Sequence, residues 1–568
     1  MAAVIPVEAE PAQPSSALNR LLWDRRLNHY PNTGRRYWYL AIVVLATIIL
    51  YYELYVGGAV SPSIIAEYNM SFTFYVNITV VGSAICAFSS LLAGLADRWG
   101  RANMVTYGLA VTGLLIAFGI PNAPNKFIFG LVSVLVAFVE GIILVATPAL
   151  VRDFSPQLGR ASAMGFWTLG PVVGSLVVSE VSSHTLGSLP AWQDQFMICG
   201  IVGLVVFVIA LFGLRELSPN LRDQLMVSIR DRALIEAKAS GISVNTNRPW
   251  RQMMHVNIIG SAFAIAVFLI LYYTAVGFFT IYFTTIFGFS LSQANGIGNW
   301  FWAFDAIALI IVGVVSDAVK VRKPFMLVGA VGAIVMSIIF LTRATHPTTG
   351  YYSFVLIISL LAVFMGIAYA PWMASFTETV ERRNPALTAT GLAVWGWIIR
   401  AVVAVSIFVL PFVISSVTPL VQYGTQVATL SAKYQSELTT IAAIDPRTLA
   451  TLSATPADQA AAVTAIGEIS QKLNVDQATA IQKLQAAAAV PKADLAFLQA
   501  HGTEVEQASR STPGQWQTWW WVCIGGQIVF IPLIFVMSGR WSRRKAMRDL
   551  ADHQEKVEAE LAALAAKS

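Results

Sequence analysis

Long apolar blocks, separated by short polar turns, dominate the chain from residue 37 onward and predict membrane-spanning helices. Each block is apolar over about 18 residues or more, enough for a helix to cross about 30 Å of hydrocarbon. We count twelve such blocks, at residues 37–60, 74–96, 103–120, 127–150, 160–181, 193–214, 255–288, 292–316, 324–342, 351–374, 388–415 and 517–538. Because a lipid-exposed backbone must satisfy its own hydrogen bonds, all of them should be helices. The pattern therefore predicts an all-α polytopic membrane protein with twelve transmembrane helices.

Composition supports this class and excludes several others. The chain has 568 residues, of which 56% are hydrophobic and 12% charged, whereas typical soluble domains carry about 25% charged residues. So little charge could not cover the surface of a soluble enzyme or of a nucleic-acid-binding protein. Cys86, Cys199 and Cys523 lie far apart in separate apolar blocks. This placement argues against a secreted disulfide scaffold and against a metal site.

Lysine and arginine gather on one side of the predicted membrane. If the N-terminus lies in the cytoplasm, 28 of the 37 lysines and arginines fall in the two tails and in the cytoplasmic turns. The short external turns hold only Lys126 and Arg343. Because positive residues are enriched on the cytoplasmic side, we expect a multi-pass protein of the cytoplasmic (cell) membrane with both termini inside.

The polar segments divide the chain into seven parts. They are a cytoplasmic N-terminal tail (1–36), a six-helix bundle (37–214), a cytoplasmic central loop (215–254), helices 7–11 (255–415), an external alanine-rich insert (416–516), helix 12 (517–538) and a cytoplasmic C-terminal tail (539–568). Capping residues and prolines predict helices in the insert at Pro456–Leu473, Val475–Val490 and Lys492–Ala508. Two interpretations of the insert stay open: a functional helical cap, or a tolerated loop insertion.

An internal repeat relates the two halves of the chain. The turn after helix 2, residues 93–101, carries Asp97, and the turn after helix 8, residues 313–323, carries Asp317. These aspartates are 220 residues apart and occupy the same place in each half. Two six-helix halves in the same orientation form the parallel-repeat plan of many secondary transporters.

The first of these turns resembles the signature of the major facilitator superfamily, which has the form G-x-L-A-D-R-x-G-R-K between helices 2 and 3. The matching residues are Leu95, Ala96, Asp97, Arg98, Gly100 and Arg101. Ala93 replaces the first glycine, and Ala102 replaces the last basic residue. The resemblance implies the major facilitator fold, with two pseudo-symmetric six-helix bundles that rock against each other.

A cytoplasmic latch is implied by the same resemblance. In that family, the aspartate and arginine of this turn hold a contact that breaks when the halves rock. Asp97 is then expected to face the start of helix 11, and Arg98 or Arg101 to pair with Asp153 below helix 4. Gly100 would let neighbouring helices approach closely. The alternative is that these arginines only enforce the membrane topology.

Helix 5 contains a second family element. Gly170, Pro171 and Gly174 resemble the G-P-x-x-G motif that is enriched in proton-coupled exporters. Glycine and proline there also serve ordinary bending and close packing. Drug exporters usually have an arginine four residues before a glycine in helix 4, but Ala137 stands at that spacing before Gly141. This absence counts against an exporter.

Four charged residues lie deep in the predicted spans, where each costs about 2.5 kcal/mol or more. They are Glu53 in helix 1, Glu140 in helix 4, Asp305 in helix 8 and Arg400 in helix 11. Asp305 and Arg400 lie near the membrane midplane at 1.5 Å per residue, so a pair between them is plausible. Arg400 would bind an anionic substrate, while Asp305 would hold Arg400 or take the coupling proton. Alternatively, the two form a static salt bridge.

Glu53 and Glu140 have no cation at similar depth in their own half. A carboxyl group in such a low-dielectric place can bind and release a proton near neutral pH, as a proton-coupling site requires. Glu53 stands where many metabolite–proton symporters of the family have an aspartate. Glu140 is the second candidate, unless it is a permanently protonated acid that is hydrogen-bonded to another helix. Several aromatic residues, Trp395 among them, could line the cavity or merely pack.

These observations predict a proton-coupled secondary transporter that moves a small organic solute by alternating access, and Arg400 favours an anionic metabolite as that solute. Symport is favoured, and export of drugs or metabolites by proton antiport is the alternative. We expect no enzymatic activity, because none of the six histidines lies in mid-span and no HExxH motif occurs. No cofactor is expected beyond the proton gradient. The expected partners are the substrate and the lipid bilayer, with no nucleic acid, and the protein is expected to be a monomer.

Overall fold

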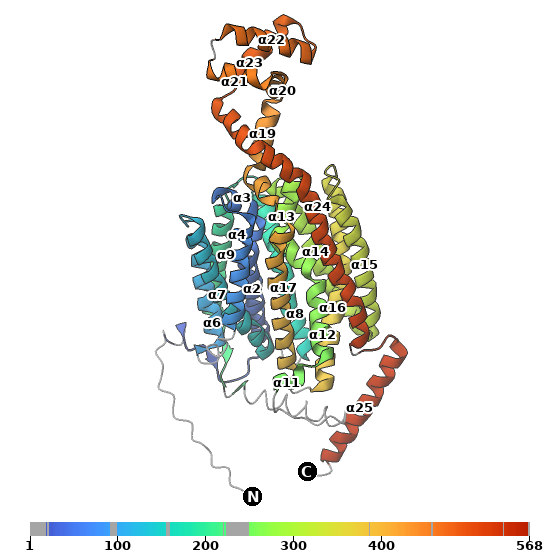
Figure 1. Ribbon diagram of the computed structural model, residues 1–568. Coiled ribbons are helices and arrows are strands. Elements are labelled where there is room, and N and C mark those ends of the chain that lie inside the picture. Colours follow the sequence, from blue (N-terminus) through green and yellow to red (C-terminus); the bar gives the residue numbers. More distant parts are fainter. Residues whose placement is uncertain are drawn as a thin grey trace.

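The computed structural model is a bundle of long helices that carries a smaller helical cap at one end (Figure 1). It describes residue 19 and residues 22–90, 99–154, 159–219, 221–222, 249–384, 387–455, 458–537 and 539–565. We call the end of the bundle that bears the cap the cap end. The opposite end, where strand β1 (Arg26–Leu27) and helix α25 (Arg543–Ala565) lie, is the tail end.

The first half of the bundle follows the order of the chain. Its helices are α2 (Thr33–Ala59), α3 (Ser61–Glu67), α4 (Phe72–Ser89), α6 (Arg101–Leu114) with its π-helical continuation η2 (Leu115–Gly119), α7 (Lys126–Phe154), α8 (Gly159–Thr185) and α9 (Trp192–Gly213). Strand β2 (Glu216–Leu217) follows α9 and pairs in parallel with β1. This short ladder ties the segment before α2 to the segment after α9 at the tail end.

The second half repeats the plan. Its helices are α11 (Pro249–Met253), α12 (Val256–Phe268), α13 (Ile270–Phe287), α14 (Leu291–Val319), α15 (Lys323–Arg343), α16 (Tyr351–Arg383), α17 (Thr388–Val413) and the membrane-length part of α24 (Lys492–Val536). Local signals fix several ends. Gly288 ends α13 with a φ of +65°, and Ser290 and Gln293 form a capping box that starts α14.

Eleven helices of the described chain are long and apolar enough to cross a membrane. Helix α8, which coincides with the predicted fifth span, is not among these eleven helices. It nevertheless packs between α2 and α14 inside the bundle. The all-α fold of twelve bundle-spanning segments therefore agrees with the sequence prediction.

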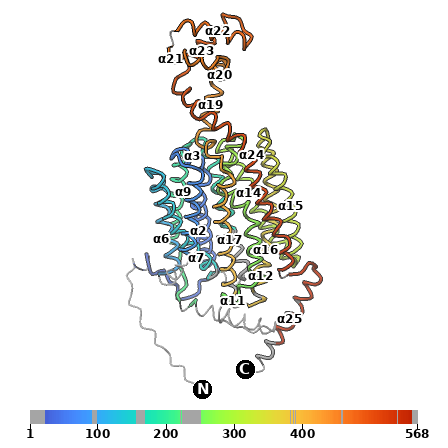
Figure 2. Tube along the Cα trace, in the orientation of Figure 1, coloured from blue at the N-terminus to red at the C-terminus, as the bar shows by residue number. Residues whose placement is uncertain are grey.

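The two halves meet along three helix pairs. Helix α8 packs on α14, the cap-end part of α2 packs on α13, and α4 packs on α17. Figure 2 shows the first half, coloured blue to teal, beside the second half, coloured green to red, so that segments far apart in the sequence lie next to each other.

The cap is built from short helices and from the start of a very long one. Its elements are α18 (Val417–Pro419), η4 (Leu420–Gly424), α19 (Thr425–Lys433), α20 (Gln435–Ala443), α21 (Pro446–Ala454), α22 (Gln459–Leu473), α23 (Gln477–Ala488) and the first turns of α24. Helix α24 is continuous over 45 residues and passes through Pro513. The sequence predicts two helices here, Lys492–Ala508 and 517–538, but the polar stretch between them continues the helix.

The cap also touches the first half of the bundle. The backbone N–H of Phe72 donates to Thr418 Oγ1 (3.1 Å), and Gln422 Nε2 donates to the carbonyl oxygen of Met70 (3.0 Å). The cap is covalently part of the second half through α17 and α24. These hydrogen bonds therefore connect the two halves at the cap end.

Candidate functional site

A cavity of about 360 Å³ lies between the two halves in the middle of the bundle. Helices α2, α4, η2, α7, α8 and α9 of the first half line it, together with α13, α16 and α17 of the second half. Its volume falls within the range of about 300–1,000 Å³ that is typical of ligand pockets. Its charged lining residues are Glu53, Glu140 and Arg400, so three of the four charges that the sequence singles out meet here.

Glu140 faces this cavity from α7. Its side chain is 1% exposed, and neither carboxylate oxygen has a hydrogen-bond partner among the described residues. A buried polar atom without a partner is costly in any protein and more so in a membrane. Such a carboxyl group is available to bind a proton or a ligand that enters the cavity.

Arg400 enters the same cavity from α17, in the other half. It is half-buried, and no described carboxylate lies within ion-pair distance of its guanidinium group. Trp395 also lines the cavity, and its indole N–H has no hydrogen-bond partner in the described chain. An arginine and a free indole N–H can together hold the oxygens of an anionic group.

The predicted pair between Asp305 and Arg400 does not form. Asp305 is buried in α14 and packs against α16, where a Cβ atom added at Gly366 would lie 3.2 Å from its Oδ1. Arg400 instead lies on α17, which packs against α4 and α12. The sequence estimates the depth of the two charges, but equal depth does not make two side chains on different helices point toward each other.

Glu53 lies at the edge of the cavity and points into the first half. It is 4% exposed, and Thr112 Oγ1 of α6 donates to its Oε2 (2.7 Å). On the opposite side Gly203 of α9 leaves room for Oε1, because a Cβ atom at position 203 would collide with that oxygen. Thr112 is a residue that sequence analysis missed, since a threonine in a membrane helix carries no distinctive signal.

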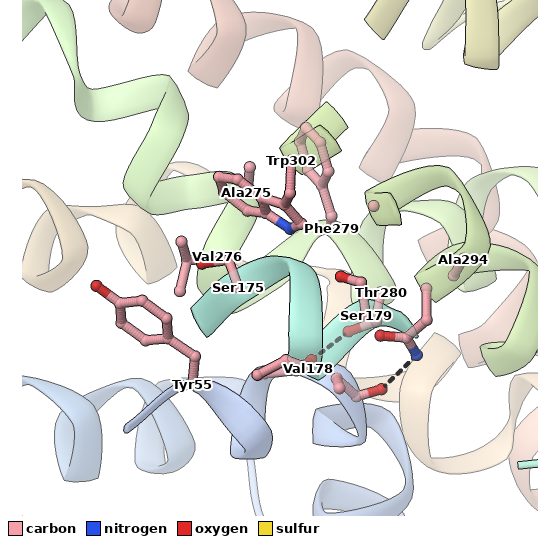
Figure 3. A pocket seen from close by; sticks show the side chains of 14 residues that line it. Tyr55, Ser175, Val178, Ser179, Ala275, Val276, Phe279, Thr280, Ala294 and Trp302 are labelled. Atoms are coloured by element: carbon pink, nitrogen blue, oxygen red, sulfur yellow. Dashed lines mark hydrogen bonds between the residues drawn. The ribbon is translucent and has the colours of Figure 1, made fainter. Parts of the chain in front are cut away.

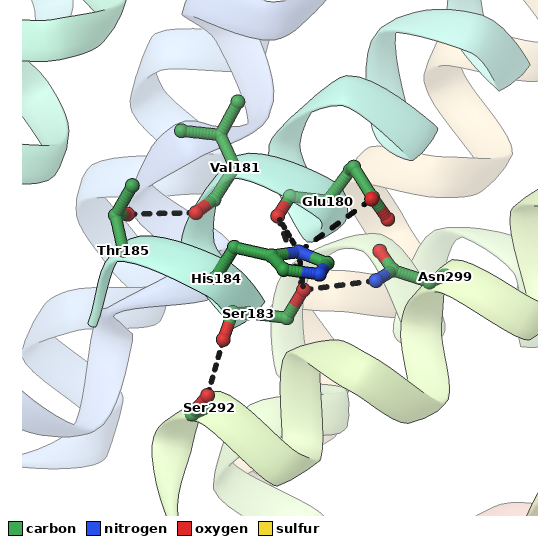
Figure 4. Close-up of polar contacts among 7 residues, drawn as sticks. All are labelled: Glu180, Val181, Ser183, His184, Thr185, Ser292 and Asn299. Atoms are coloured by element: carbon green, nitrogen blue, oxygen red, sulfur yellow. Dashed lines mark hydrogen bonds and ion pairs between the residues drawn. The ribbon is translucent and has the colours of Figure 1, made fainter. Parts of the chain in front are cut away.

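The halves are joined at the cap end by a seam of small polar residues (Figures 3 and 4). Thr280 Oγ1 of α13 donates to the carbonyl oxygen of Gly58 (2.6 Å), and Asn295 Nδ2 of α14 donates to that of Ala59 (3.0 Å). A side chain at Gly58 would collide with the carbonyl oxygen of Val276. The helices therefore approach closely beside a small pocket of about 30 Å³, which Figure 3 shows.

Figure 4 shows the continuation of this seam between α8 and α14. Ser292 Oγ donates to the carbonyl oxygen of Ser183, and Asn299 Nδ2 donates to Ser183 Oγ (2.9 Å). His184 and Glu180 lie beside it, exposed at the surface, with 3.5 Å between His184 Nδ1 and Glu180 Oε1. These contacts hold α8 of the first half against α14 of the second half on the cap-end side of the bundle.

At the tail end, the implied ion pair between Arg101 and Asp153 is present. Arg101 Nη1 lies 2.9 Å from Asp153 Oδ2 and 3.2 Å from Oδ1. Gly100, with a φ of +97°, precedes α6 and turns the chain into it. Asp97 and Arg98 lie outside the described residues. That this pair works as a latch stays a prediction.

Glu216 adds a contact that sequence analysis missed. Its Oε2 accepts hydrogen bonds from the backbone N–H groups of Arg101 (2.6 Å) and Ala102 (3.2 Å) at the start of α6. An acidic group at a helix N-terminus is stabilised by the unpaired N–H groups and by the helix dipole. Its only sequence signal is an acidic residue at the point where the sixth apolar block ends.

The second half contains the counterpart of the ion pair. Arg322, just before α15, lies 2.5 Å from Asp317 and 3.3 Å from Glu378 near the end of α16. Arg101 and Asp153 hold the corresponding places at the start of α6 and the end of α7. The internal repeat is thus visible in side-chain contacts as well as in the chain.

The glycines of the helix-5 motif pack α8 against α2. A Cβ atom at Gly174 would lie 2.5 Å from Tyr51 Cβ, and one at Gly170 would lie 2.7 Å from Thr47 Cγ2. Pro171, between them, lines the cavity. The described geometry accounts for the glycines by close packing, and it supports no choice between import and export.

A bundle of two similar six-helix halves, with a charged cavity between them, is the architecture of a secondary transporter. The family model of the Major Facilitator Superfamily matches residues 43–404, and the chain belongs to this family. It is a membrane transporter and not an enzyme. The match ends within α17, so the cap lies outside it.

Solved structures agree on the fold. A bacterial homolog of the human lysosomal transporter Spinster, in an inward-facing and unoccupied conformation, superposes with a TM-score of 0.53 and 16% identity, covering 90% of this chain and all of that one. A D-xylose–proton symporter gives a TM-score of 0.51 and 15% identity, covering 66% of this chain and 89% of that one. At these identities the likeness shows the fold alone.

Proposed function

We propose that this protein couples the movement of a small organic anion to the movement of protons, by symport across the cytoplasmic membrane. The observation that carries the proposal is the central cavity, in which an unpaired arginine, Arg400, faces the same space as an unpartnered acid, Glu140. One group suits an anion, and the other suits a proton. Because they come from different halves, movement of the halves changes their surroundings together.

The distribution of lysine and arginine indicates which end of the bundle faces the cytoplasm. We place the tail end in the cytoplasm, because 28 of the 37 lysines and arginines lie in the tails and in the turns on that side. The hydrogen bonds at the cap end then join the two halves on the outer side of the membrane. We infer that a state in which the halves are joined at the cap end releases the substrate to the cytoplasm.

The cycle we propose uses only residues of this chain. In the outward-open state Arg400 binds the anion and Glu140 takes a proton, so that the cavity becomes less charged before the halves rock. After rocking, both ligands leave toward the cytoplasm. Glu140 is our first candidate because it faces the cavity, Glu53 is the second, and Asp305 is the third. The proton gradient supplies the energy without a cofactor, and a monomer in the bilayer suffices.

Antiport remains the second candidate function. The Gly170–Gly174 motif of α8 favours it, because this motif resembles that of proton-coupled exporters. In that case a proton entering from outside would drive a solute out of the cell. The two modes differ in the direction of the pH gradient that drives accumulation.

A liposome experiment separates the two modes. Purified protein in liposomes is given a mixture of carboxylates, sugars and cationic drugs outside, and retained solutes are measured by mass spectrometry. Symport predicts accumulation of an acid only when the interior is alkaline. Accumulation of a drug only when the interior is acidic would establish antiport and refute our proposal.

Variants link the activity to the site. We expect Glu140→Gln to abolish accumulation driven by the gradient but to leave exchange of the substrate across the membrane. Arg400→Gln should abolish both, because the anion loses its cation. Glu180→Gln is the matched control, since Glu180 lies exposed on α8 outside the cavity. Equal loss in Glu180→Gln and Glu140→Gln would contradict the assignment.

A further inference from the structure

The central cavity has two levels of different chemistry along the axis of the bundle. Glu140 and Arg400 lie in the middle of their helices, together with the indole N–H of Trp395. Toward the cap end the lining changes to apolar side chains. We call this part of the cavity the apolar level, and its lining side chains are Ile78, Ile120, Phe129, Phe196, Val403 and Ile407.

Three of the hydroxyl groups that line the cavity are bonded to backbone carbonyl oxygens. Tyr75 donates to the carbonyl oxygen of Gly57 (3.1 Å), and Ser83 donates to that of Thr79 (2.8 Å). Ser133 donates to Phe129 in the same way (2.8 Å). Because these three hydroxyl protons are engaged, they are not available to a hydroxyl-rich solute such as a sugar.

The length of the apolar level can be estimated from α17. Arg400 and Ile407 are seven residues apart on this helix, which corresponds to about 10 Å at 1.5 Å per residue. At the cap end, the two halves are hydrogen-bonded to each other at Gly58 and Thr280. A ligand whose head contacts Arg400 therefore has about 10 Å of apolar cavity for its remaining part.

We propose that the transported solute is an amphipathic organic monoanion. Its acidic head lies against Arg400 and Trp395, and its apolar body lies in the apolar level between α4, α7 and α17. The inference rests on the proposed function and narrows its substrate class. Arg400 is the one free cation among the described residues that line the cavity, and one cation suits a single negative charge. Burial of an apolar body in this level is favourable at about 25 cal/mol per Å².

Binding of alkanesulfonates tests the proposal. These probes keep their negative charge at every pH and do not cross the bilayer as neutral acids. The full-length protein in lipid nanodiscs is titrated calorimetrically with chains of four to ten carbons, and empty nanodiscs correct for partition into lipid. We expect affinity to rise about fourfold with each methylene group, until the body fills the apolar level, and then to stay constant.

Two variants locate the head and the body separately. Arg400→Gln should weaken every chain length by about tenfold to a hundredfold, as expected when a charged hydrogen bond is lost. Val403→Trp fills the apolar level, so the affinity should stop rising at a shorter chain while butanesulfonate binds as in the wild type. If Val403→Trp does not fold, Ile407→Asn replaces it and should lower the gain per methylene group. Arg510→Gln, an exposed arginine of the cap, is the control.

The outcomes separate this inference from the function on which it rests. Affinity that does not depend on chain length, or equal binding of alkyltrimethylammonium ions, overturns the amphipathic substrate. Proton-driven uptake of short carboxylates that does not increase with chain length also overturns the amphipathic substrate, although it supports symport. Length-dependent binding that requires Arg400 supports the inference even if the liposome experiment shows no proton coupling.

Discussion

At the scale of single residues, the buried acids of the first half differ in how their oxygens are satisfied. Glu53 accepts a hydrogen bond from Thr112, whereas Glu140 has no partner in the described chain. An acid that is hydrogen-bonded between helices can stabilise their packing, and an acid that faces a cavity can bind and release a proton. The contribution of Thr112 to stability can be measured directly.

We expect Thr112→Val to lower the free energy of unfolding by about 1–3 kcal/mol, because Glu53 Oε2 then stays buried without a donor. Thermal unfolding in nanodiscs measures the change. In a double-mutant cycle, Glu53→Leu should remove most of the penalty. Thr79→Val is the control, since Thr79 donates only to its own helix. An equal loss in both threonine variants would refute a specific role of this bond.

Glu216 gives the stability a dependence on pH. Burial raises the pKa of its carboxyl group above the usual value of 4.5. The folded protein therefore holds this proton more tightly than the unfolded chain does. The stabilisation is full below about pH 4.5 and is lost as the pH rises through the folded-state pKa. The unfolding temperature of the wild type, relative to Glu216→Gln, should accordingly fall between pH 4.5 and pH 7. A difference that stays constant over this range would contradict the assignment.

At the scale of the elements, each half holds one arginine between the start of one helix and the end of the next. Arg101 with Asp153 joins α6 to α7, and Arg322 with Glu378 joins the start of α15 to α16. The first pair is more enclosed, since its side chains are 13% and 7% exposed, whereas Glu378 is 40% exposed. The two pairs should therefore differ in strength.

Removal of one member of the enclosed pair should destabilise the protein by about 3 kcal/mol, because the other member stays largely buried and loses this ion pair. We expect this loss for Asp153→Asn. The exposed counterpart Glu378→Gln should cost well below 1 kcal/mol. The exchanged pair Arg101→Asp with Asp153→Arg should recover part of the loss. Unfolding temperatures in nanodiscs provide the measurement. An equal loss of stability in Asp153→Asn and Glu378→Gln would contradict the expected difference in strength between the two ion pairs.

Sequence periodicity was sufficient for the helices but not for the directions of their side chains. The twelve apolar blocks could be predicted from span length, and the resemblance of the turn at residues 93–101 implied that Arg98 or Arg101 pairs with Asp153. The separation of Asp305 from Arg400 could not, because it depends on how α14 and α17 are rotated within the second half. The continuity of α24 was missed for a different reason: polar residues between a cap and a membrane do not distinguish a helix from a loop.

At the scale of the whole molecule, the cap bridges the halves at the end where the seam also joins them. Two hydrogen bonds make this connection: Phe72 of the first half donates to Thr418 of the cap, and Gln422 of the cap donates to Met70. Helices α17 and α24 hold the cap to the second half. If the halves rock as proposed, these bonds must break in every cycle.

Cross-linking tests this requirement. Ser71→Cys with Thr418→Cys, joined by a short bis-maleimide, should stop transport, because the cap can no longer leave the first half. A cross-link between Tyr434→Cys and Asp494→Cys is the control, since both residues belong to the cap and are in contact (2.8 Å). Transport that continues with the 71–418 cross-link would show that the cap does not separate from the first half.

Because α24 is one unbroken helix, movement of the second half can be blocked or followed from outside the membrane through the cap. A helix that runs from the cap into the bundle without a joint transmits rotation of the second half to the cap as a swing. An antibody fragment wedged between the cap and α3 would then arrest the transporter without entering the membrane. A dye on the cap would report each turnover by its changing distance from the first half.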